Sequence, residues 1–238
     1  MSFLSLPRRF DPAVPEIMDR PGNDPELLRA DLRVLESINR FLGGHRIALG
    51  YLNEFLGDVP MNSLTILDLA TGGADIPRTI VAWARRRNIR VEITAVDSNP
   101  EILRIAREHC ATWPEIHIEQ HDLLTLPYPP ASFDIVLCSL TLHHFANADV
   151  VAILRRIHDI ARVGCIVNDL RRNRIAICLS KLMARTVITN PIARFDAPAS
   201  CERAFTVDEL RALAAQAGMG DVAIRRHRFF RMALVGRK

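Results

Sequence analysis

The residues with the clearest chemical potential lie in a short loop at the end of an apolar segment. Residues 67–76 read Leu-Asp-Leu-Ala-Thr-Gly-Gly-Ala-Asp-Ile, so a strand-like run passes through small residues into a helical pattern. Small residues let a ligand lie directly on the backbone, and ligands of open α/β sheets bind at the carboxyl ends of strands. The carboxylates of Asp68 and Asp75 suit a ligand that carries an ammonium and a sulfonium, and they oppose the pyrophosphate of a dinucleotide.

Two more acidic residues follow expected strands further along the chain. Asp97 comes directly after the segment 91–96, and an acid at this strand tip can accept hydrogen bonds from both hydroxyls of a ribose. Asp122 follows a brief strand, where its carboxylate could reach an adenine amino group while the Leu123 amide faces a ring nitrogen. Asp97 therefore predicts a nucleoside ligand, and the loop decides against a dinucleotide.

An alternation of strands and helices would position these residues. The expected strands are 65–69, 91–96, 116–118, 133–140 and 164–167. The expected helices between them are 76–87, 100–110 and 150–161. Such a β-α-β alternation predicts a parallel sheet with right-handed crossovers. Beyond it we expect a helix at 175–186, a Pro-containing loop at 190–201, a helix at 206–218 and a closing hairpin over 222–235.

The first sixty residues have a different character. Five prolines interrupt residues 7–25, which predicts an irregular arm, and a helical pattern then begins at Pro25 and stops at the two glycines 43–44. A second helix is expected to end near Gly57. We therefore expect an N-terminal arm and helical cap over residues 1–60, placed before a larger domain over 61–238.

The composition of the chain limits its class. About half of its 238 residues are apolar, which is enough for a sizeable buried core. The five cysteines are scattered and the histidines lack metal spacing, so we expect reduced thiols and no metal. The net charge of +4 is spread along the chain, which favours an ordinary solvated surface over nucleic-acid binding. A secretory signal and a long apolar span are lacking, so we expect a soluble, cytoplasmic protein.

The motifs, taken in order, resemble those of the class I S-adenosylmethionine-dependent methyltransferases. Residues 67–75 look like the family's glycine-rich first motif, although Ala70 stands where glycine is usual. Residues 133–139, Phe-Asp-Ile-Val-Leu-Cys-Ser, resemble its fourth-strand motif. The resemblance covers Leu64 to about Val167. It implies a doubly wound, mostly parallel seven-stranded, Rossmann-like sheet whose last hairpin contains one antiparallel strand.

The same resemblance implies S-adenosyl-L-methionine as cofactor and assigns residues to its parts. Those expected to line the methionine part are Asp68, Ala70, Thr71 and Gly72. Those expected to hold the nucleoside are Asp97 and Ser98 at the ribose and Asp122 and Leu123 at the adenine. We also include Asp75 and Ser139 among the cofactor-binding residues.

The flanking segments are similar to the small-molecule branch of this family. Residues 38–46, 168–172 and 196–200 resemble quinone-pathway methyltransferases, and more closely bacterial methyltransferases found beside type III polyketide synthases. This implies a phenolic, quinol-like or polyketide acceptor. The protein is then expected to act in secondary metabolism, and a homodimer is compatible with the sequence.

The expected reaction is an in-line displacement that moves the sulfonium methyl to an acceptor oxygen or carbon. His143 and His144 follow the fourth strand, where the acceptor would approach, and a neutral imidazole there could take a phenolic proton. Arg194, in the expected loop, could stabilise a phenolate. The alternative is that His143 and His144 are packed or capping residues and Arg194 is a surface residue. Positioning of the two substrates would then be sufficient for catalysis.

Other functions remain open from the sequence. An RNA methyltransferase is disfavoured because the tail lacks a basic and aromatic platform. A non-catalytic partner that keeps the fold for assembly is an alternative from another class, and an NAD oxidoreductase is opposed by the loop. The identity of the acceptor, the methylated atom and the oligomeric state stay undetermined.

Overall fold

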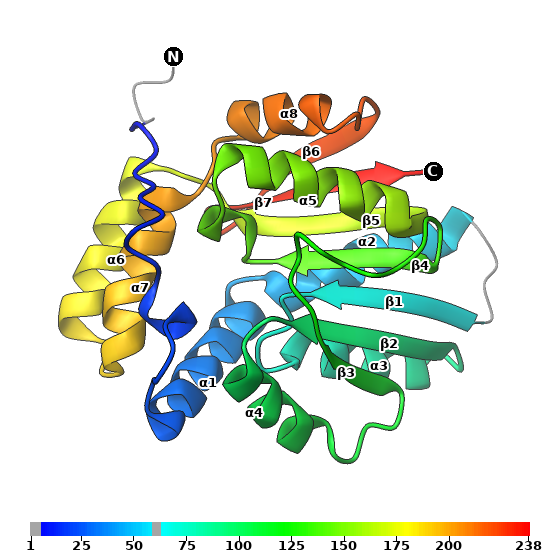
Figure 1. The fold of residues 1–238 in the computed structure, drawn as a ribbon, viewed down its shortest axis with the longest axis horizontal. Coiled ribbons are helices and arrows are strands. Elements are labelled where there is room, and N and C mark those ends of the chain that lie inside the picture. Colours follow the sequence, from blue (N-terminus) through cyan, green and yellow to red (C-terminus); the bar gives the residue numbers. More distant parts are fainter. Residues whose placement is uncertain (1–5, 59–62) are drawn as a thin grey trace.

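The computed structural model describes residues 6–58 and 63–238 and contains one seven-stranded sheet (Figure 1). The strand order is β3-β2-β1-β4-β5-β7-β6. The strands are β1 (Ser63–Leu69), β2 (Arg90–Asp97), β3 (Ile116–Gln120), β4 (Phe133–Ser139), β5 (Ala161–Leu170), β6 (Val222–His227) and β7 (Arg231–Arg237). The first five strands are parallel, and β7 is antiparallel to both β5 and β6. The doubly wound sheet with one antiparallel strand in its last hairpin is therefore confirmed.

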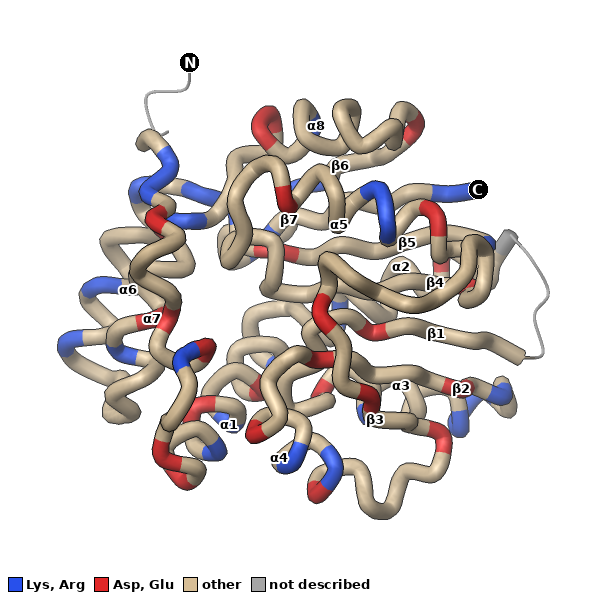
Figure 2. The backbone as a smooth tube through the Cα atoms, viewed as in Figure 1, with Lys and Arg blue, Asp and Glu red and all other residues tan. Residues whose placement is uncertain are grey.

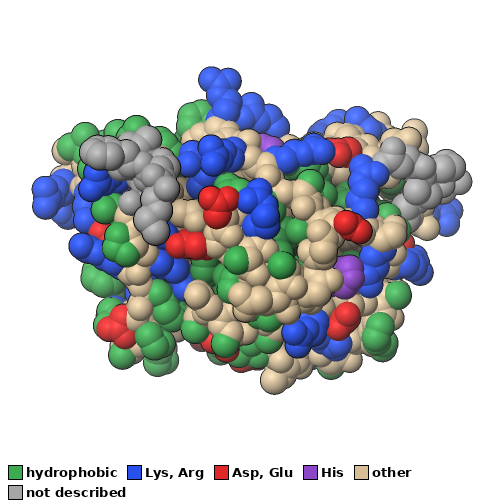
Figure 3. Space-filling view, turned by 90° about the horizontal axis from the view of Figure 1, so that it is seen from above, with side chains coloured by type: hydrophobic (Ala, Val, Ile, Leu, Met, Phe, Trp, Pro, Cys, Tyr) green, Lys and Arg blue, Asp and Glu red, His purple; other side chains and the backbone are tan. Residues whose placement is uncertain are grey.

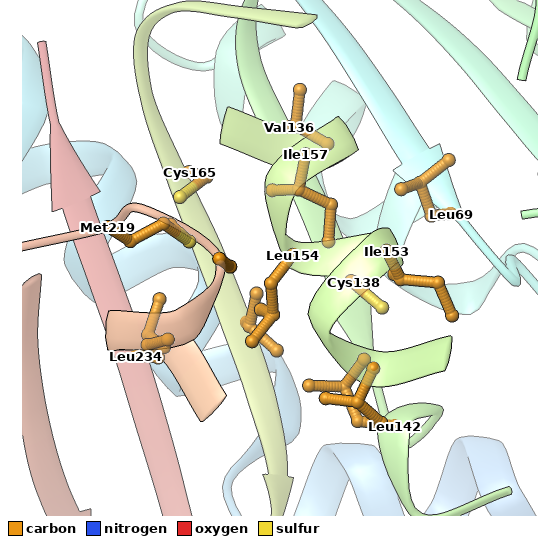
Figure 4. Close-up of a cluster of buried hydrophobic side chains, with 14 of the residues drawn as sticks. Leu69, Val136, Cys138, Leu142, Ile153, Leu154, Ile157, Cys165, Met219 and Leu234 are labelled. Atoms are coloured by element: carbon orange, nitrogen blue, oxygen red, sulfur yellow. The ribbon is translucent and has the colours of Figure 1, made fainter. Parts of the chain in front are cut away.

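Helices cover both faces of this sheet. One face is covered by α5 (Asn147–Ile160) and α8 (Val207–Gln216), and the other by α2 (Gly44–Asp58), α3 (Asp75–Arg85) and α4 (Pro100–Cys110). Figure 4 shows the first of these cores, where Ile153, Leu154 and Ile157 of α5 lie over Val136 and Cys138 of β4. Because β4 is buried on both faces, its sequence is almost wholly apolar rather than alternating.

Local signals explain why several elements begin where they do. Helix α4 begins at Pro100, whose missing N–H would be unpaired at a helix start, while the Asn99 side chain accepts from the next two amides. Helix α8 begins with a capping box in which Thr206 and Glu209 bond each other's backbone amides. These two starts lie where the sequence predicted them.

One predicted loop is wrong. The structure has a helix, α7 (Pro191–Arg203), where we expected a loop at 190–201. Asn190 caps it by accepting from the amides of Ile192 and Ala193, as a helix start requires. Pro198 lies inside it and forgoes one helical hydrogen bond. Contacts with α6 (Arg174–Thr186) and α1 (Pro25–Phe41) support this interrupted helix.

The two helices of the N-terminal region, α1 and α2, pack against different parts of the molecule. Helix α1 contacts α7 and α4, at the end of the molecule toward which the parallel strands point (Figure 1). Helix α2 instead packs on the sheet, and Tyr51, Leu52 and Phe55 belong to the core between β1, β5 and α3. The second helix of the expected cap is therefore a layer of the main domain, while the division at residue 60 stays a prediction.

Candidate cofactor and acceptor site

The loop between β1 and α3 follows an unusual backbone path. Ala70, Gly72 and Ala74 all have positive φ angles, of 53°, 56° and 56°. This left-handed region is open to glycine but costs an L-residue roughly 1–2 kcal/mol. The Thr71 amide donates to the Val96 carbonyl at 2.8 Å, which ties the loop to β2. The strained position of Ala70 gives a physical reason for the glycine that is usual in this motif.

Asp97 links the loop to the tip of β2. One carboxylate oxygen accepts from the Gly72 amide and the other from the Asn99 amide, both at 3.1 Å. The side chain is buried, and burial raises the pKa of Asp97 above its usual value. The expected ribose-binding residue thus lies directly against the glycine loop.

Asp68 is a buried carboxylate without a cationic partner. It is 2% exposed and forms no ion pair within residues 6–58 and 63–238. Burial raises the pKa of Asp68 to about 7, and the nearby carboxylates of Asp75 and Asp97 add to this. An uncompensated acid at this depth suits a cationic ligand, because such a ligand would supply the missing charge. The donor set therefore fits the ammonium and sulfonium of the expected cofactor.

Asp75 begins α3 and is bound by the N-terminal helices. Its Oδ2 lies 2.6 Å from Nε2 of His45 and accepts from the Asn39 amide group at 3.1 Å. The side-chain oxygen of Asn39 accepts from the fully buried guanidinium of Arg231 at 3.0 Å. Asp75 therefore holds α1 and α2 beside the loop. The sequence did not predict this structural role.

The remaining predicted cofactor residues lie around the same strand ends. Ser98 is exposed after β2, and Ser139 is half-buried at the end of β4. Asp122 is exposed and accepts from the Leu124 amide at 2.8 Å, whereas Leu123 is buried in the core under α5. Their proposed contacts with the cofactor stay predictions.

His143 forms a buried pair with Asp169. The short helix η2 (Leu142–His144) follows β4, and Nδ1 of His143 lies 2.7 Å from Oδ1 of Asp169 at the end of β5. The other oxygen of Asp169 accepts from the His143 amide at 3.2 Å. Burial alone would raise the pKa of Asp169, but the interactions with His143 outweigh burial and hold this pKa below its usual value. With Nδ1 donating to Asp169, Nε2 of His143 is left as a proton acceptor.

His144 is bound by the N-terminal arm (residues 6–24). Its Nδ1 lies 2.7 Å from Oδ2 of Asp19, and its Nε2 lies 4.0 Å from Glu16. Burial opposes the charged form, but Asp19 and Glu16 outweigh it and raise the pKa of His144 to about 9. A histidine that is charged at neutral pH cannot accept a proton, so His143 is the better candidate base.

Glu16 connects the two histidines to α7. It lies 3.9 Å from Nε2 of His143, and it accepts from the Ser200 hydroxyl at 2.8 Å and from Arg203 at 3.4 Å. A ligand atom from each of Glu16, His143 and His144 lies within 4.8 Å of the others, close enough to hold a metal ion. Because Ser200 and Arg203 already engage both oxygens of Glu16, we assign the group to an ionic network.

The predicted catalytic role of Arg194 does not agree with the structure. Arg194 is an exposed residue of α7, and its Nε donates to the Ala184 carbonyl of α6 at 2.9 Å. The expected loop is a helix, so this side chain is directed to the neighbouring helix instead of to the histidines. The guanidinium groups near the histidine pair are those of Arg8, which donates to the His143 carbonyl at 3.3 Å, and of Arg203, which binds Glu16.

The arm closes the histidine side of the site. Arg8 donates to the carbonyls of Phe145 and Arg203, and the amides of Ile17 and Met18 donate to Asp196 of α7. A pocket of about 150 Å³ remains between the arm and η2. It is lined by Phe10, Asp11, Pro12, Pro15, Asp19, His144, Phe145, Ala146, Asp149 and Arg203. This pocket is large enough for a small aromatic group.

The raised pKa of His144 makes a prediction about stability. The pKa of His144 is about 9 in the folded chain and 6.5 ordinarily, so its charged form stabilises the fold. This stabilisation is fully present below pH 6.5 and is lost as pH rises through 9. Compared with His144→Gln, the wild type should lose on the order of 2–3 kcal/mol of unfolding free energy over this window. Urea unfolding at a series of pH values measures the unfolding free energy of the wild type and of His144→Gln. The groups facing this ring are Glu16, Asp19, Asp169, His143 and Arg203. Parallel curves for the two proteins would contradict the prediction.

Comparisons with known proteins agree with this geometry. Residues 66–164 match the family model described as a methyltransferase domain. The demethylmenaquinone methyltransferase of Deinococcus radiodurans is 39% identical over 83 residues, which are 34% of this chain and 33% of that protein. The ubiquinone/menaquinone biosynthesis C-methyltransferase UbiE of Rickettsia bellii is 31% identical over 98 residues, 39% of this chain and 37% of that one. The matched segments thus span about a third of these relatives' length.

A solved structure extends the likeness of the fold beyond the matched segment. Human N-acetylserotonin methyltransferase in complex with S-adenosylmethionine has a TM-score of 0.66 at 17% identity, covering 90% of this chain and 56% of that one. At that identity the likeness concerns the fold. The matched segment contains the glycine loop, Asp97 and the His143 strand end. Residues 66–164 therefore match a methyltransferase domain, and the chain has the fold of the class I methyltransferases.

Proposed function

We propose that this protein transfers a methyl group from S-adenosylmethionine to a small phenolic, quinol-like or polyketide acceptor. The observation that supports it most is the buried His143–Asp169 pair, which ends β4 and β5 beside the strands that carry Asp68 and Asp97. An acceptor that must lose a proton requires a base at this position. The names of the matched relatives, which concern quinone biosynthesis, support a small aromatic acceptor.

Different residues of the chain bind the cofactor and accept the acceptor's proton. When bound, the cofactor supplies an already activated methyl group. Asp97 accepts from the ribose, and Asp68 compensates the positive charge of the methionine part. Nε2 of His143 takes the acceptor's proton, while Asp169 holds Nδ1–H and stabilises the imidazolium that results. Because Glu16 faces Nε2, the acceptor would displace this part of the arm on entry.

Methylation of a ring carbon is the second candidate. The Rickettsia relative is named a C-methyltransferase. Loss of the hydroxyl proton raises electron density both on the oxygen and on the adjacent ring carbons. In C-methylation the methylated carbon then loses its hydrogen as a proton to solvent and the oxygen regains a proton from His143, so one base serves either outcome. The choice then depends on which atom the pocket beside η2 directs toward the methyl group.

A product assay tests the proposed function. Purified protein is incubated with isotope-labelled S-adenosylmethionine and separate panels of phenols, quinols and transfer RNA, and products are identified by mass spectrometry. We expect a methylated small aromatic product and unmodified RNA, with fragmentation separating O- from C-methylation. Methylated RNA would favour the alternative enzyme. Cofactor binding without any methylated product would favour a non-catalytic partner.

A further inference from the structure

Exposed apolar side chains are concentrated at one end of the molecule. Eleven large hydrophobic side chains are exposed in the described chain, and six of them fall within residues 175–195. These six, which we call the α6 face, are Ile175, Leu179, Leu182, Met183, Val187 and Phe195. Scattered exposed apolar residues are ordinary, whereas a continuous group of them marks an interaction surface.

The α6 face is one side of an amphipathic helix. Its helical members recur at steps of three and four residues, so they lie along the same side of α6. The opposite side carries Ile177 and Ala184, which are buried. Helix α6 packs mainly on α7 and lies at the edge of the molecule, beyond the sheet (Figure 1). The described part of the chain therefore leaves this face uncovered.

The segment that carries the α6 face is rich in basic residues. Residues 171–195 contain six basic side chains and no acidic one. The basic residues are Arg171, Arg172, Arg174, Lys181, Arg185 and Arg194. Figure 2 shows these blue segments along α6 and α7, and Figure 3 shows basic and hydrophobic side chains side by side at that end. Lys181 is partly neutralised by Glu202, and Arg172 is buried against Glu209, whereas Arg185 is exposed.

We propose that the α6 face docks on the surface of an anionic lipid bilayer. A helix with an apolar side bordered by cations lies in the membrane interface, because the acyl region accepts the apolar side chains and the headgroups neutralise the cations. A second copy of the chain fits this charge poorly. A two-fold interface packs the same patch of both copies against itself, so one surface bordered by cations would face another.

The position of the α6 face favours an exchange of lipophilic molecules with the membrane. Helix α7, on which α6 packs, carries Asp196, Ser200 and Arg203 to the arm and the histidine pair. Docking therefore places the acceptor side of the domain toward the bilayer. The described helices include none long and apolar enough to cross a membrane, so this contact is superficial. Docking goes beyond the proposed methyl transfer and does not depend on it.

Vesicle flotation tests the docking directly. The full chain is mixed with vesicles of phosphatidylcholine alone or of phosphatidylcholine with phosphatidylglycerol, and the bound fraction is measured at low and high salt. We expect binding to the anionic vesicles that weakens with salt. Leu182→Glu combined with Met183→Glu should reduce the partition coefficient at least about tenfold, because both side chains would otherwise enter the acyl region. Arg185→Glu should weaken it by a similar factor.

Matched controls lie elsewhere on the surface. Leu124 and Phe229 are 45% and 48% exposed, close to the 57% and 46% of Leu182 and Met183, so Leu124→Glu and Phe229→Glu should leave binding unchanged. Thermal unfolding checks that all variants fold alike. Equal binding by every variant, or none by the wild type, would overturn the proposal. A wild-type dimer that Leu182→Glu with Met183→Glu abolishes, without vesicle binding, would assign the face to a second copy instead. No cofactor or acceptor is present, so failure here is separate from failure of methyl transfer.

Discussion

Replacing His143 by Ala is expected to lower turnover by roughly 10²–10⁴, the usual contribution of general acid–base catalysis. Nε2 of His143 is the proton acceptor that the Asp169 contact leaves free, and the neighbouring His144 is charged at neutral pH. Cofactor affinity should barely change, because the predicted cofactor contacts lie at the ends of β1 to β4 and do not include His143. Single-turnover kinetics and calorimetry measure the two effects separately.

Asp169→Asn is the companion variant, because Asp169 acts through His143 as a positioning residue. It should lower the rate constant of methyl transfer with little effect on the acceptor's KM, and it should alter the pH–rate profile, which a purely structural residue would leave unchanged. His158→Ala, at a half-buried histidine in the last turn of α5, is the matched control. Near-normal turnover in His143→Ala, with an unchanged pH profile, would mean that positioning alone is sufficient. The hydroxyl proton would then pass to water.

The sheet and most helices could be predicted because their signals are local. Helix α4 lies at Pro100–Cys110, as expected, since Asn99 and Pro100 specify its start and apolar residues recur on one side. The strands were recognisable because a parallel sheet covered on both faces requires continuous apolar runs. The order of these elements then left few topologies open, so the class I architecture followed from patterns within short windows.

The misplaced elements depend on tertiary contacts instead. A proline within residues 190–201 indicates a break, yet α7 keeps Pro198 because α6, α1 and the arm pack around it. Helix α2 looked like a cap because its amphipathic pattern does not say which surface it covers. Its burial against β5 and α3 was not visible in its own sequence. Propensity and periodicity predict the element, while its partner is decided by the rest of the fold.

The same distinction applies to the site. That Asp68, Asp97 and the glycine loop lie close together could be predicted because they belong to the ends of strands that are neighbours in the sheet. The partners of the histidines could not, since Asp169 is 26 residues from His143 and Asp19 is 125 residues from His144. The sequence signal for Asp169 was its place at the end of the fifth strand, beside the end of the fourth. Glu16, in an arm expected to be irregular, gave no such signal.

Replacing Asp97 by Ala should weaken binding of S-adenosylmethionine by about 1.5–3 kcal/mol, the cost of losing hydrogen bonds between a charged acceptor and neutral donors. This corresponds to roughly a 10- to 150-fold rise in Kd. The carboxylate is buried at the tip of β2, and it already accepts from the Gly72 amide, so a ribose placed over the loop lies within its reach. Isothermal calorimetry with the cofactor and with its demethylated product measures the change.

Two variants separate a lost ribose contact from a disturbed loop. Asp97→Asn keeps one carbonyl oxygen for the Gly72 amide, but it loses the charge and the bond from the Asn99 amide. It should therefore bind with intermediate affinity and lose less stability than Asp97→Ala. Asp122→Ala removes an exposed carboxylate from the neighbouring strand end and is expected to have the smaller effect, since solvent already competes for that group. Wild-type affinity in Asp97→Ala would remove Asp97 from the nucleoside site. An equal loss of affinity and stability in both Asp97 variants would show instead that the carboxylate serves only to hold the loop.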